Sequence, residues 1–168
     1  NRRVLAEAGD SIKRFLHSGI FELGDKLGPL LWQFAPTKKY DEADFGKFLE
    51  LLPASFDGRP LRHVVEVRHD SFCTPAFVKL LRPFRIPVVY AEHATYPAIA
   101  DLTGDFVYAR LQKGQEELEA GYAPKALDDW AGRAKSWAKG GAPADLKPIL
   151  PDPKAKKQPR DVFVYFIH

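Results

Sequence analysis

The chain alternates between short, β-branched apolar runs and longer stretches in which apolar residues recur at helical spacing. The short runs are apolar on both faces, as the buried strands of parallel sheets are. Five strands are predicted, over residues 30–34, 64–68, 86–93, 106–112 and 161–168. Because helical patterns separate the strands, the rhythm predicts an α/β protein with a parallel sheet covered by helices.

Amphipathic helices are predicted over residues 3–17, 44–52, 74–81 and 126–138. Asp44 and Thr74 are the expected N-caps of the second and third helices, because short polar side chains accept hydrogen bonds from a first helical turn. Residues 95–102 are expected to form at most a short helix. Residues 141–160, rich in Pro and Lys, predict a long surface loop. A single domain over residues 1–168 accounts for the pattern.

Each predicted strand becomes polar at its C-terminal end. The polar positions are Gln33, Glu66 with Arg68, Glu92 with His93, Arg110 with Gln112, and His168. Parallel α/β proteins carry their sites at this edge, in barrels and in open sheets alike. Alternate residues of a strand share a face, so Glu66 and Arg68 point to the same side. Charges on a buried face are costly unless they pair or meet a ligand, so a site is predicted here.

Composition and charge fit one ordinary folded domain. Of 168 residues, 45% are hydrophobic and 28% charged, and a net charge of +3 excludes neither a nucleic-acid binder nor a common enzyme. Cys73 is the single cysteine, which excludes an intramolecular disulfide and a site made of thiolates alone. No run approaches the roughly 18 apolar residues that cross a bilayer, and the first residues given lack the apolar core of a signal peptide. A cytoplasmic protein without a membrane partner is expected.

Four motifs resemble the YecE-like family, known as domain of unknown function seventy-two. They are Leu-Gly-Pro-Leu-Leu-Trp-Gln-Phe at 27–34, Val-Glu-Val-Arg-His at 65–69, Tyr-Ala-Arg-Leu at 108–111 and Val-Tyr-Phe-Ile at 164–167. The resemblance covers nearly the whole chain and implies a TIM-like (β/α) barrel. Five strands cannot close an eight-stranded barrel, and the family's N-terminal strands with their Gly-Trp segment are absent. An incomplete barrel, part of a longer domain, is therefore expected.

Two of the motifs continue differently from those of many relatives. The chain reads Arg-Leu-Gln-Lys at 110–113 where many have Arg-Leu-His-Gly, and Phe-Ile-His at 166–168 where many have Phe-Asn-Asn. A role of the family's His or Asn is therefore not carried over to Gln112 or His168. The resemblance implies a fold and the place of a site, but no reaction.

The candidate site is an anion-binding site at the strand ends, built from Arg68 and Arg110 with Glu66 and Glu92. Guanidinium groups bind phosphate bidentately and stay charged, which favours a ligand that bears phosphate. The expected substrate-binding residues are Gln33, Arg68, Arg110, Gln112 and His168. In the first hypothesis the protein is an enzyme that acts on a phosphate-bearing substrate, with phosphodiester hydrolysis as one candidate reaction. Glu66 or Glu92 is then the catalytic base, and the arginines stabilise developing charge.

Three alternatives stay open. The protein is a non-catalytic binder of nucleic acid or of a phosphorylated metabolite, with Lys38 and Lys39 among the contacts to nucleic-acid phosphates. The Glu66–Arg68 pair fills the sheet interior and fixes strand register without binding a ligand. The chain is inactive because absent strands carry part of the site. No cofactor is predicted; a divalent metal also stays open, although no spacing of metal-ligand type enforces one.

Overall fold

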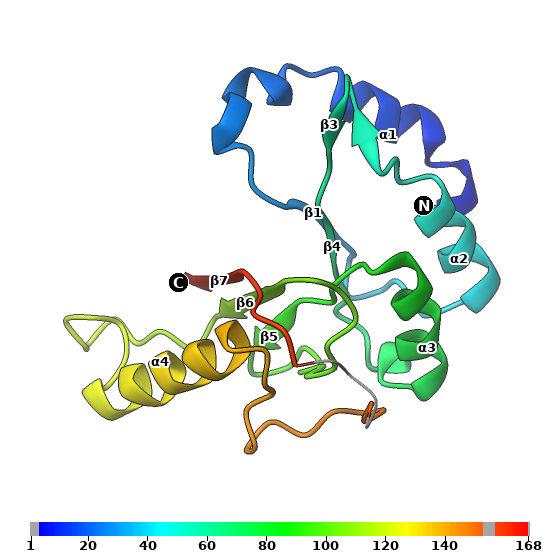
Figure 1. Ribbon diagram of the computed structural model, residues 1–168. Coiled ribbons are helices and arrows are strands. Elements are labelled where there is room, and N and C mark those ends of the chain that lie inside the picture. The colour runs from blue at the N-terminus through cyan, green and yellow to red at the C-terminus, as the bar shows by residue number, and fades with distance from the viewer. Residues whose placement is uncertain (1–3, 153–156, 168) are drawn as a thin grey trace.

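The computed structural model describes residues 4–152 and 157–167 as a mixed α/β protein (Figure 1). Its parallel strands are β1 (Leu30–Gln33), β4 (His63–Glu66), β5 (Tyr90–Glu92), β6 (Val107–Leu111) and β7 (Val162–Phe166). Parallel pairs join β1 to β4, β5 to β6, and β6 to β7. A parallel bridge between Val65 and Val88 connects the two groups. The spatial order of the strands is therefore their order in the chain, and the prediction of parallel strands is confirmed.

Helices fill the spans between the strands. They are the α-helices α1 (Gly9–Leu16), α2 (Glu42–Glu50), α3 (Pro75–Phe84) and α4 (Pro124–Ala138), and the 3-10 helices η1 (Leu5–Glu7), η2 (Ile20–Lys26) and η3 (Asp70–Phe72). An antiparallel hairpin of β2 (Ser55–Phe56) and β3 (Arg59–Pro60), absent from the prediction, precedes β4. Strands of two residues are too short to leave a periodic signal in a sequence.

Asp41, and not the predicted Asp44, caps helix α2. The Asp41 carboxylate accepts a hydrogen bond from the backbone N–H of Asp44 at 2.9 Å. The Asp44 carboxylate is used elsewhere, because it accepts from the Lys38 ammonium at 2.7 Å and from the Ala6 backbone N–H at 3.0 Å. The cap prediction was therefore three residues late, and Asp44 instead ties the N-terminal segment to α2.

The Thr74 cap of helix α3 is confirmed. Its Oγ1 accepts a hydrogen bond from the backbone N–H of Phe77 at 3.3 Å. The helix runs to Phe84, beyond the predicted end at Leu81, and includes Pro83. Proline lacks one backbone donor, but in the last turn this loss does not end the helix.

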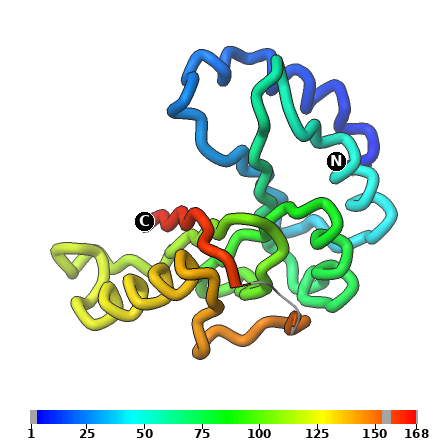
Figure 2. Tube along the Cα trace, in the orientation of Figure 1, coloured from blue at the N-terminus to red at the C-terminus, as the bar shows by residue number. Residues whose placement is uncertain are grey.

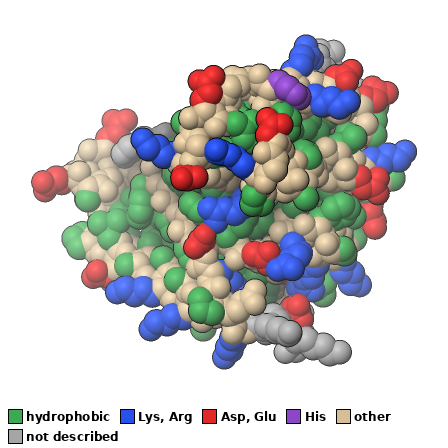
Figure 3. Space-filling model, turned by 45° about the horizontal axis from the view of Figure 1, so that its top comes forward, with side chains coloured by type: hydrophobic (Ala, Val, Ile, Leu, Met, Phe, Trp, Pro, Cys, Tyr) green, Lys and Arg blue, Asp and Glu red, His purple; other side chains and the backbone are tan. Residues whose placement is uncertain are grey.

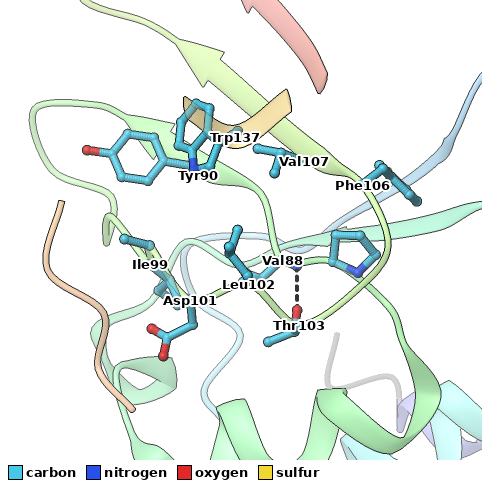
Figure 4. Close-up of a pocket in the computed structure, with 11 residues that line it drawn as sticks. Val88, Tyr90, Ile99, Asp101, Leu102, Thr103, Phe106, Val107 and Trp137 are labelled. Carbon is cyan, nitrogen blue, oxygen red and sulfur yellow. Dashed lines mark hydrogen bonds between the residues drawn. The ribbon is translucent and has the colours of Figure 1, made fainter. Parts of the chain in front are cut away.

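Residues 95–102 form no helix and are irregular chain. Thr103 fastens the end of this segment: its hydroxyl donates to the Ile86 carbonyl at 2.8 Å and accepts from the Val88 N–H at 3.2 Å. Figure 4 shows the cavity between this segment, β5 and Trp137. Its volume of about 10 Å³ is roughly that of one water position, so it is a packing gap with no room for a larger ligand.

The two faces of the strand layer have different cores. On the outer face, Val65 and Val88 pack with Phe45, Phe72 and Phe77 of the segments around α2, η3 and α3. Farther along the same face, Val107, Ala109 and Leu111 pack under Trp130 and Trp137 of α4. The inner face carries a smaller cluster of Val64, Val89, Phe106 and Tyr108. Figure 2 shows α2 and α3 toward the β1–β4 end of the strand layer and α4 toward the β6–β7 end.

The strands lie in one layer whose outer members are β1 and β7. No pairing between β1 and β7 occurs among the described residues, so the structure shows a parallel α/β layer and no closed barrel. The predicted surface loop has no helix or strand in its described parts, 141–152 and 157–160. Asp101 anchors it, because its carboxylate accepts from the N–H groups of Ile149 and Leu150 at 2.7 and 2.8 Å. No helix within the described residues is long and apolar enough to cross a membrane.

Candidate functional site

Strand register brings Gln33, Glu66 and Arg110 to the same end of the inner face. Gln33 is paired with Glu66 across β1 and β4, and Arg110 is paired with Ala91 on β5 and with Tyr165 on β7. Paired residues of parallel strands point to the same side of a sheet. Their side chains therefore face the side that carries the inner cluster, at the C-terminal ends of the strands.

Glu66 is the centre of this group. It is fully buried, with a relative exposure of 0%. Its Oε1 accepts a hydrogen bond from Arg68 Nε at 2.8 Å, and its Oε2 accepts from Arg110 Nη1. The two arginine side chains are 15% and 16% exposed. Two guanidinium groups therefore offset the desolvation of one buried carboxylate.

Gln33 joins the two arginines above the carboxylate. Its Oε1 accepts from Arg68 Nη2 at 2.7 Å and from Arg110 Nη1 at 3.0 Å. The amide oxygen thus faces the guanidinium groups, and the amide NH₂ points away from them. We name Gln33, Glu66, Arg68 and Arg110 the strand-end cluster.

Ala91 explains how Arg110 reaches Glu66 across an intervening strand. It lies on β5, between β4 and β6, and points to the same side as Arg110. Its small side chain is 1% exposed, so the neighbouring groups close over it. A larger residue would occupy the path of the Arg110 side chain.

An aromatic pair supports Arg68 from the loop that follows β5. The Arg68 guanidinium lies 4.6 Å from the centre of the Tyr96 ring, which stacks on the His93 ring at 3.7 Å and 8°. His93 Nδ1 accepts from the backbone N–H groups of Thr95 and Tyr96 at 3.0 and 3.2 Å, which orients this stack. Tyr96 was not predicted, because a loop residue has no periodicity that reveals its direction.

A tyrosine pair lies beside Arg110. Tyr108 stacks on Tyr165 with ring centres 4.9 Å apart and planes inclined by 25°. Burial, followed by the charge and hydrogen bonding of Tyr165, raises the pKa of Tyr108 to about 12. Neither tyrosine was predicted, although Tyr108 is two residues from Arg110 on a strand and therefore shares its face.

Glu92 lies apart from the strand-end cluster. It follows Ala91 on β5 and so points to the opposite face, where it accepts a hydrogen bond from the Tyr122 hydroxyl at 3.0 Å. The same hydroxyl accepts from the Lys113 N–H at 2.9 Å, and burial raises the pKa of Tyr122 to about 12. The expectation that Glu92 and Glu66 line one site does not match this geometry, because strand alternation separates them.

Among the described residues, no hydrogen bond joins the side chain of Gln112 or of His69 to the cluster. The backbone N–H of Gln112 donates to the Glu92 carbonyl at 2.9 Å, and its side-chain Nε2 is buried without a hydrogen-bond partner in the described part of the chain. His168 lies outside the described residues. His69 bonds Ser71 through Nδ1 at 2.9 Å. Within residues 4–152 and 157–167, no three or more His, Cys, Asp or Glu residues gather as a metal site would require.

These features define a parallel α/β protein whose strands follow chain order and end in a buried, arginine-rich polar cluster. The family described as "Protein of unknown function DUF72" matches residues 1–166. The chain therefore belongs to the DUF72 family, and the resemblance to the YecE-like family is confirmed. A comparison with curated proteins found no match.

Solved structures of the same family share this fold. A DUF72 family protein from Thermotoga maritima superposes with a TM-score of 0.65 at 17% identity, covering 95% of this chain and 58% of its own. A DUF72 family protein from Enterococcus faecalis gives a TM-score of 0.59 at 18% identity, covering 92% and 60%. The chain therefore spans about three fifths of the length of these relatives.

Proposed function

We propose that the strand-end cluster binds an anionic, phosphate-bearing ligand, with Arg68 and Arg110 as its principal contacts. The observation that carries the proposal is that two guanidinium groups share one buried carboxylate, Glu66. Two positive charges and one negative charge leave one positive charge at a nearly buried position. An anion that binds beside these groups would balance it.

Unused hydrogen-bond donors support this proposal. Arg68 uses Nε and Nη2 for Glu66 and Gln33, and Arg110 uses Nη1 for the same two residues. Arg68 Nη1, Arg110 Nε and Arg110 Nη2 have no hydrogen-bond partner in the part of the chain that the structure describes. Guanidinium groups have five N–H donors in a fixed plane, so each arginine can hold Glu66 and an oxyanion together.

The proposal includes the architecture around the site: the parallel strands belong to a TIM-like (β/α) barrel. Strands in chain order favour a singly wound arrangement, because open doubly wound sheets reverse their strand order. The inner face also has the layered character of a barrel interior, with Val64 and Phe106 below the polar cluster. Sites in such barrels lie at the C-terminal strand ends, where Arg68 and Arg110 are found.

Binding without turnover is better supported than phosphodiester hydrolysis. Both Glu66 oxygens accept from guanidinium groups, which suits a residue that positions the arginines better than a catalytic base. Glu92 faces the other side of the strand layer and bonds Tyr122. A hydrolase would need a base from another part of the protein. Hydrolysis therefore ranks below ligand binding, and turnover of a chromogenic diester tests it directly.

A phosphorylated small molecule is favoured over nucleic acid. Figure 3 shows a face on which Lys and Arg side chains alternate with Asp and Glu, whereas nucleic-acid binders gather positive charge into one patch. Lys38, proposed above as a phosphate contact, pairs with Asp44 at 2.7 Å. In the strand-end cluster, by contrast, two arginines share the single carboxylate of Glu66.

Titration calorimetry with inorganic phosphate and with bis(p-nitrophenyl) phosphate tests the proposal. We expect binding that weakens at least ~10-fold in Arg68→Ala and in Arg110→Ala, because a hydrogen bond to a charged group contributes ~1.5–3 kcal/mol. Lys125→Ala is the matched control, since it removes an exposed cation paired only with Asp129 among the described residues. Equal affinity in all three variants would contradict the proposal, and release of p-nitrophenol would establish hydrolysis.

A further inference from the structure

We infer that the strand-end cluster selects oxyanions that carry no proton at the bound end, and so prefers a phosphodiester or a sulfate group to a protonated phosphate monoester. This inference rests on the anion site proposed above and specifies its ligand. It follows from one property of the cluster: its polar groups offer donors, and its acceptors are already used.

The carboxylates of the inner face are fully engaged in the described residues. Glu66 accepts from Arg68 at one oxygen and from Arg110 at the other. Asp161 lies at the opposite end of the strands, where it pairs with Arg62 at 2.5 Å. A proton on a bound ligand therefore finds no free carboxylate beside the two arginines.

The neutral groups around the arginines also present donors. Gln33 gives its amide oxygen to both guanidinium groups, which leaves its NH₂ to face outward. His93 Nδ1 accepts two backbone N–H groups, so a neutral His93 ring carries its proton on Nε2.

A ligand hydroxyl is therefore disfavoured at this site. An oxyanion such as sulfate, or the anionic end of a phosphodiester, presents only acceptors to the free N–H groups of Arg68 and Arg110. A protonated monoester presents a P–O–H group, whose donor would face other donors or stay unpaired. The single positive charge of Glu66, Arg68 and Arg110 together also equals the single negative charge of a diester.

The test compares two monoanions of similar shape at pH 5. Methyl phosphate carries one proton there, because the second pKa of a phosphate ester is about 6, whereas dimethyl phosphate carries none. Calorimetry is expected to show dimethyl phosphate binding about tenfold more tightly than methyl phosphate at pH 5. Sulfate, titrated at pH 5 and pH 8, should bind with nearly equal affinity at both, which controls for titration of the protein itself.

Gln33→Glu supplies an acceptor with little change of shape. One oxygen of the new carboxylate can accept from both arginines as the amide oxygen does, and the other replaces the outward NH₂. Because the added charge cancels the net positive charge of the cluster, we expect this variant to bind both ligands more weakly and to lose the preference for dimethyl phosphate at pH 5. Tyr165→Phe removes the hydroxyl of a residue that is 43% exposed and stacks on Tyr108, and it should leave the preference unchanged.

The outcomes separate this inference from the proposed function. If methyl phosphate binds as tightly as dimethyl phosphate at pH 5, the selection against protons is wrong and the anion site stands. If no anion binds the unmodified protein, both the anion site and this inference are overturned. If Tyr165→Phe shifts the preference as strongly as Gln33→Glu does, the tyrosine hydroxyl accepts from the ligand and the donor-only description fails.

Discussion

Arginine–carboxylate contacts lie at both ends of strand β4, and they differ in burial and in the number of arginines that each carboxylate binds. At the N-terminal end, Arg62 pairs with Asp161, and their side chains are 42% and 68% exposed. At the C-terminal end, Glu66 is 0% exposed and binds two arginines. Water screens the first contact, so it contributes little. The second replaces the hydration of a carboxylate completely, so each of its partners is needed.

The arginines at the two ends of β4 also have different surroundings. Arg62 lies over the rings of Phe106 and Phe163, with its guanidinium 5.6 and 5.0 Å from the ring centres. It therefore covers the end of the inner apolar cluster and retains water on its outer side. Arg68 and Arg110 instead share Gln33 and Glu66, and each has N–H groups without a hydrogen-bond partner in the described part of the chain. One end of β4 closes a core, and the other carries the proposed binding site.

Removing the buried Glu66 carboxylate should cause the largest loss of folding stability. Glu66→Leu leaves Arg68 and Arg110 without their shared acceptor and is expected to lower the free energy of unfolding by ~3 kcal/mol. Glu66→Gln keeps one acceptor oxygen and should cost less than Glu66→Leu. Urea unfolding followed by circular dichroism measures both. A loss below ~1 kcal/mol in Glu66→Leu would mean that the cluster is no more demanding than the Arg62–Asp161 pair.

Replacing Ala91 by a larger residue should displace the Arg110 side chain without changing the charge of the cluster. Ala91→Leu fills the space that Arg110 crosses and is expected to cost ~1–3 kcal/mol by overpacking. Ala109→Leu is the matched control, because Ala109 is also fully buried but lies in the core under α4. Both variants should be destabilised, whereas phosphate binding should weaken only in Ala91→Leu. Equal loss of binding in both would indicate a general effect of instability.

His63, at the N-terminal end of β4, should make the free energy of unfolding depend on pH. Its Nδ1 accepts from Trp32 Nε1 at 3.0 Å and its Nε2 donates to the Pro53 carbonyl at 2.7 Å, an arrangement that requires the neutral ring. Burial lowers the pKa of His63 below its ordinary value of 6.5, and the bond to Pro53 opposes this lowering only in part.

The unfolded chain therefore binds the His63 proton more readily than the folded chain. The free energy of unfolding should fall as the pH drops below 6.5, by at most ~1.4 kcal/mol per pH unit until the lowered pKa is reached. Thermal unfolding between pH 7.5 and 5 measures this slope. His63→Gln should reduce the slope, and an unchanged slope in that variant would show that His63 does not titrate between the two states.

The sequence predicts those site residues whose direction follows from the alternation of side chains along a strand. Glu66 and Arg68 are two residues apart at a strand end, so their common face follows directly from the pattern. Arg110 joins them because the strands lie in chain order with a small residue between, and no pattern in the sequence shows that Ala91 has this role. The separation of Glu92 from Glu66 requires the register between β4 and β5, which only the structure supplies.

Fold prediction fails where the elements are short or side chains replace backbone hydrogen bonds. The β2–β3 hairpin has two residues in each strand, too few for a period. The Asp44 carboxylate does not cap α2 because it binds Lys38 and the backbone N–H of Ala6. Ala6 is 38 residues away in the sequence, so no local pattern shows this contact. Tyr96 reaches Arg68 from a loop, whose path is decided by hydrogen bonds to His93.

The smallest change in stability is expected at the exposed Arg62–Asp161 pair. Asp161→Asn removes the charge that faces Arg62 and should change the free energy of unfolding by ~0–1 kcal/mol. Arg62→Ala should cost somewhat more, because it also uncovers the rings of Phe106 and Phe163. A double-mutant cycle in urea at 0.05 M and 1 M salt isolates the pair. The coupling energy of this pair should vanish at high salt. The coupling energy between Glu66 and Arg68 should persist, because that pair is buried and dissolved ions screen it little.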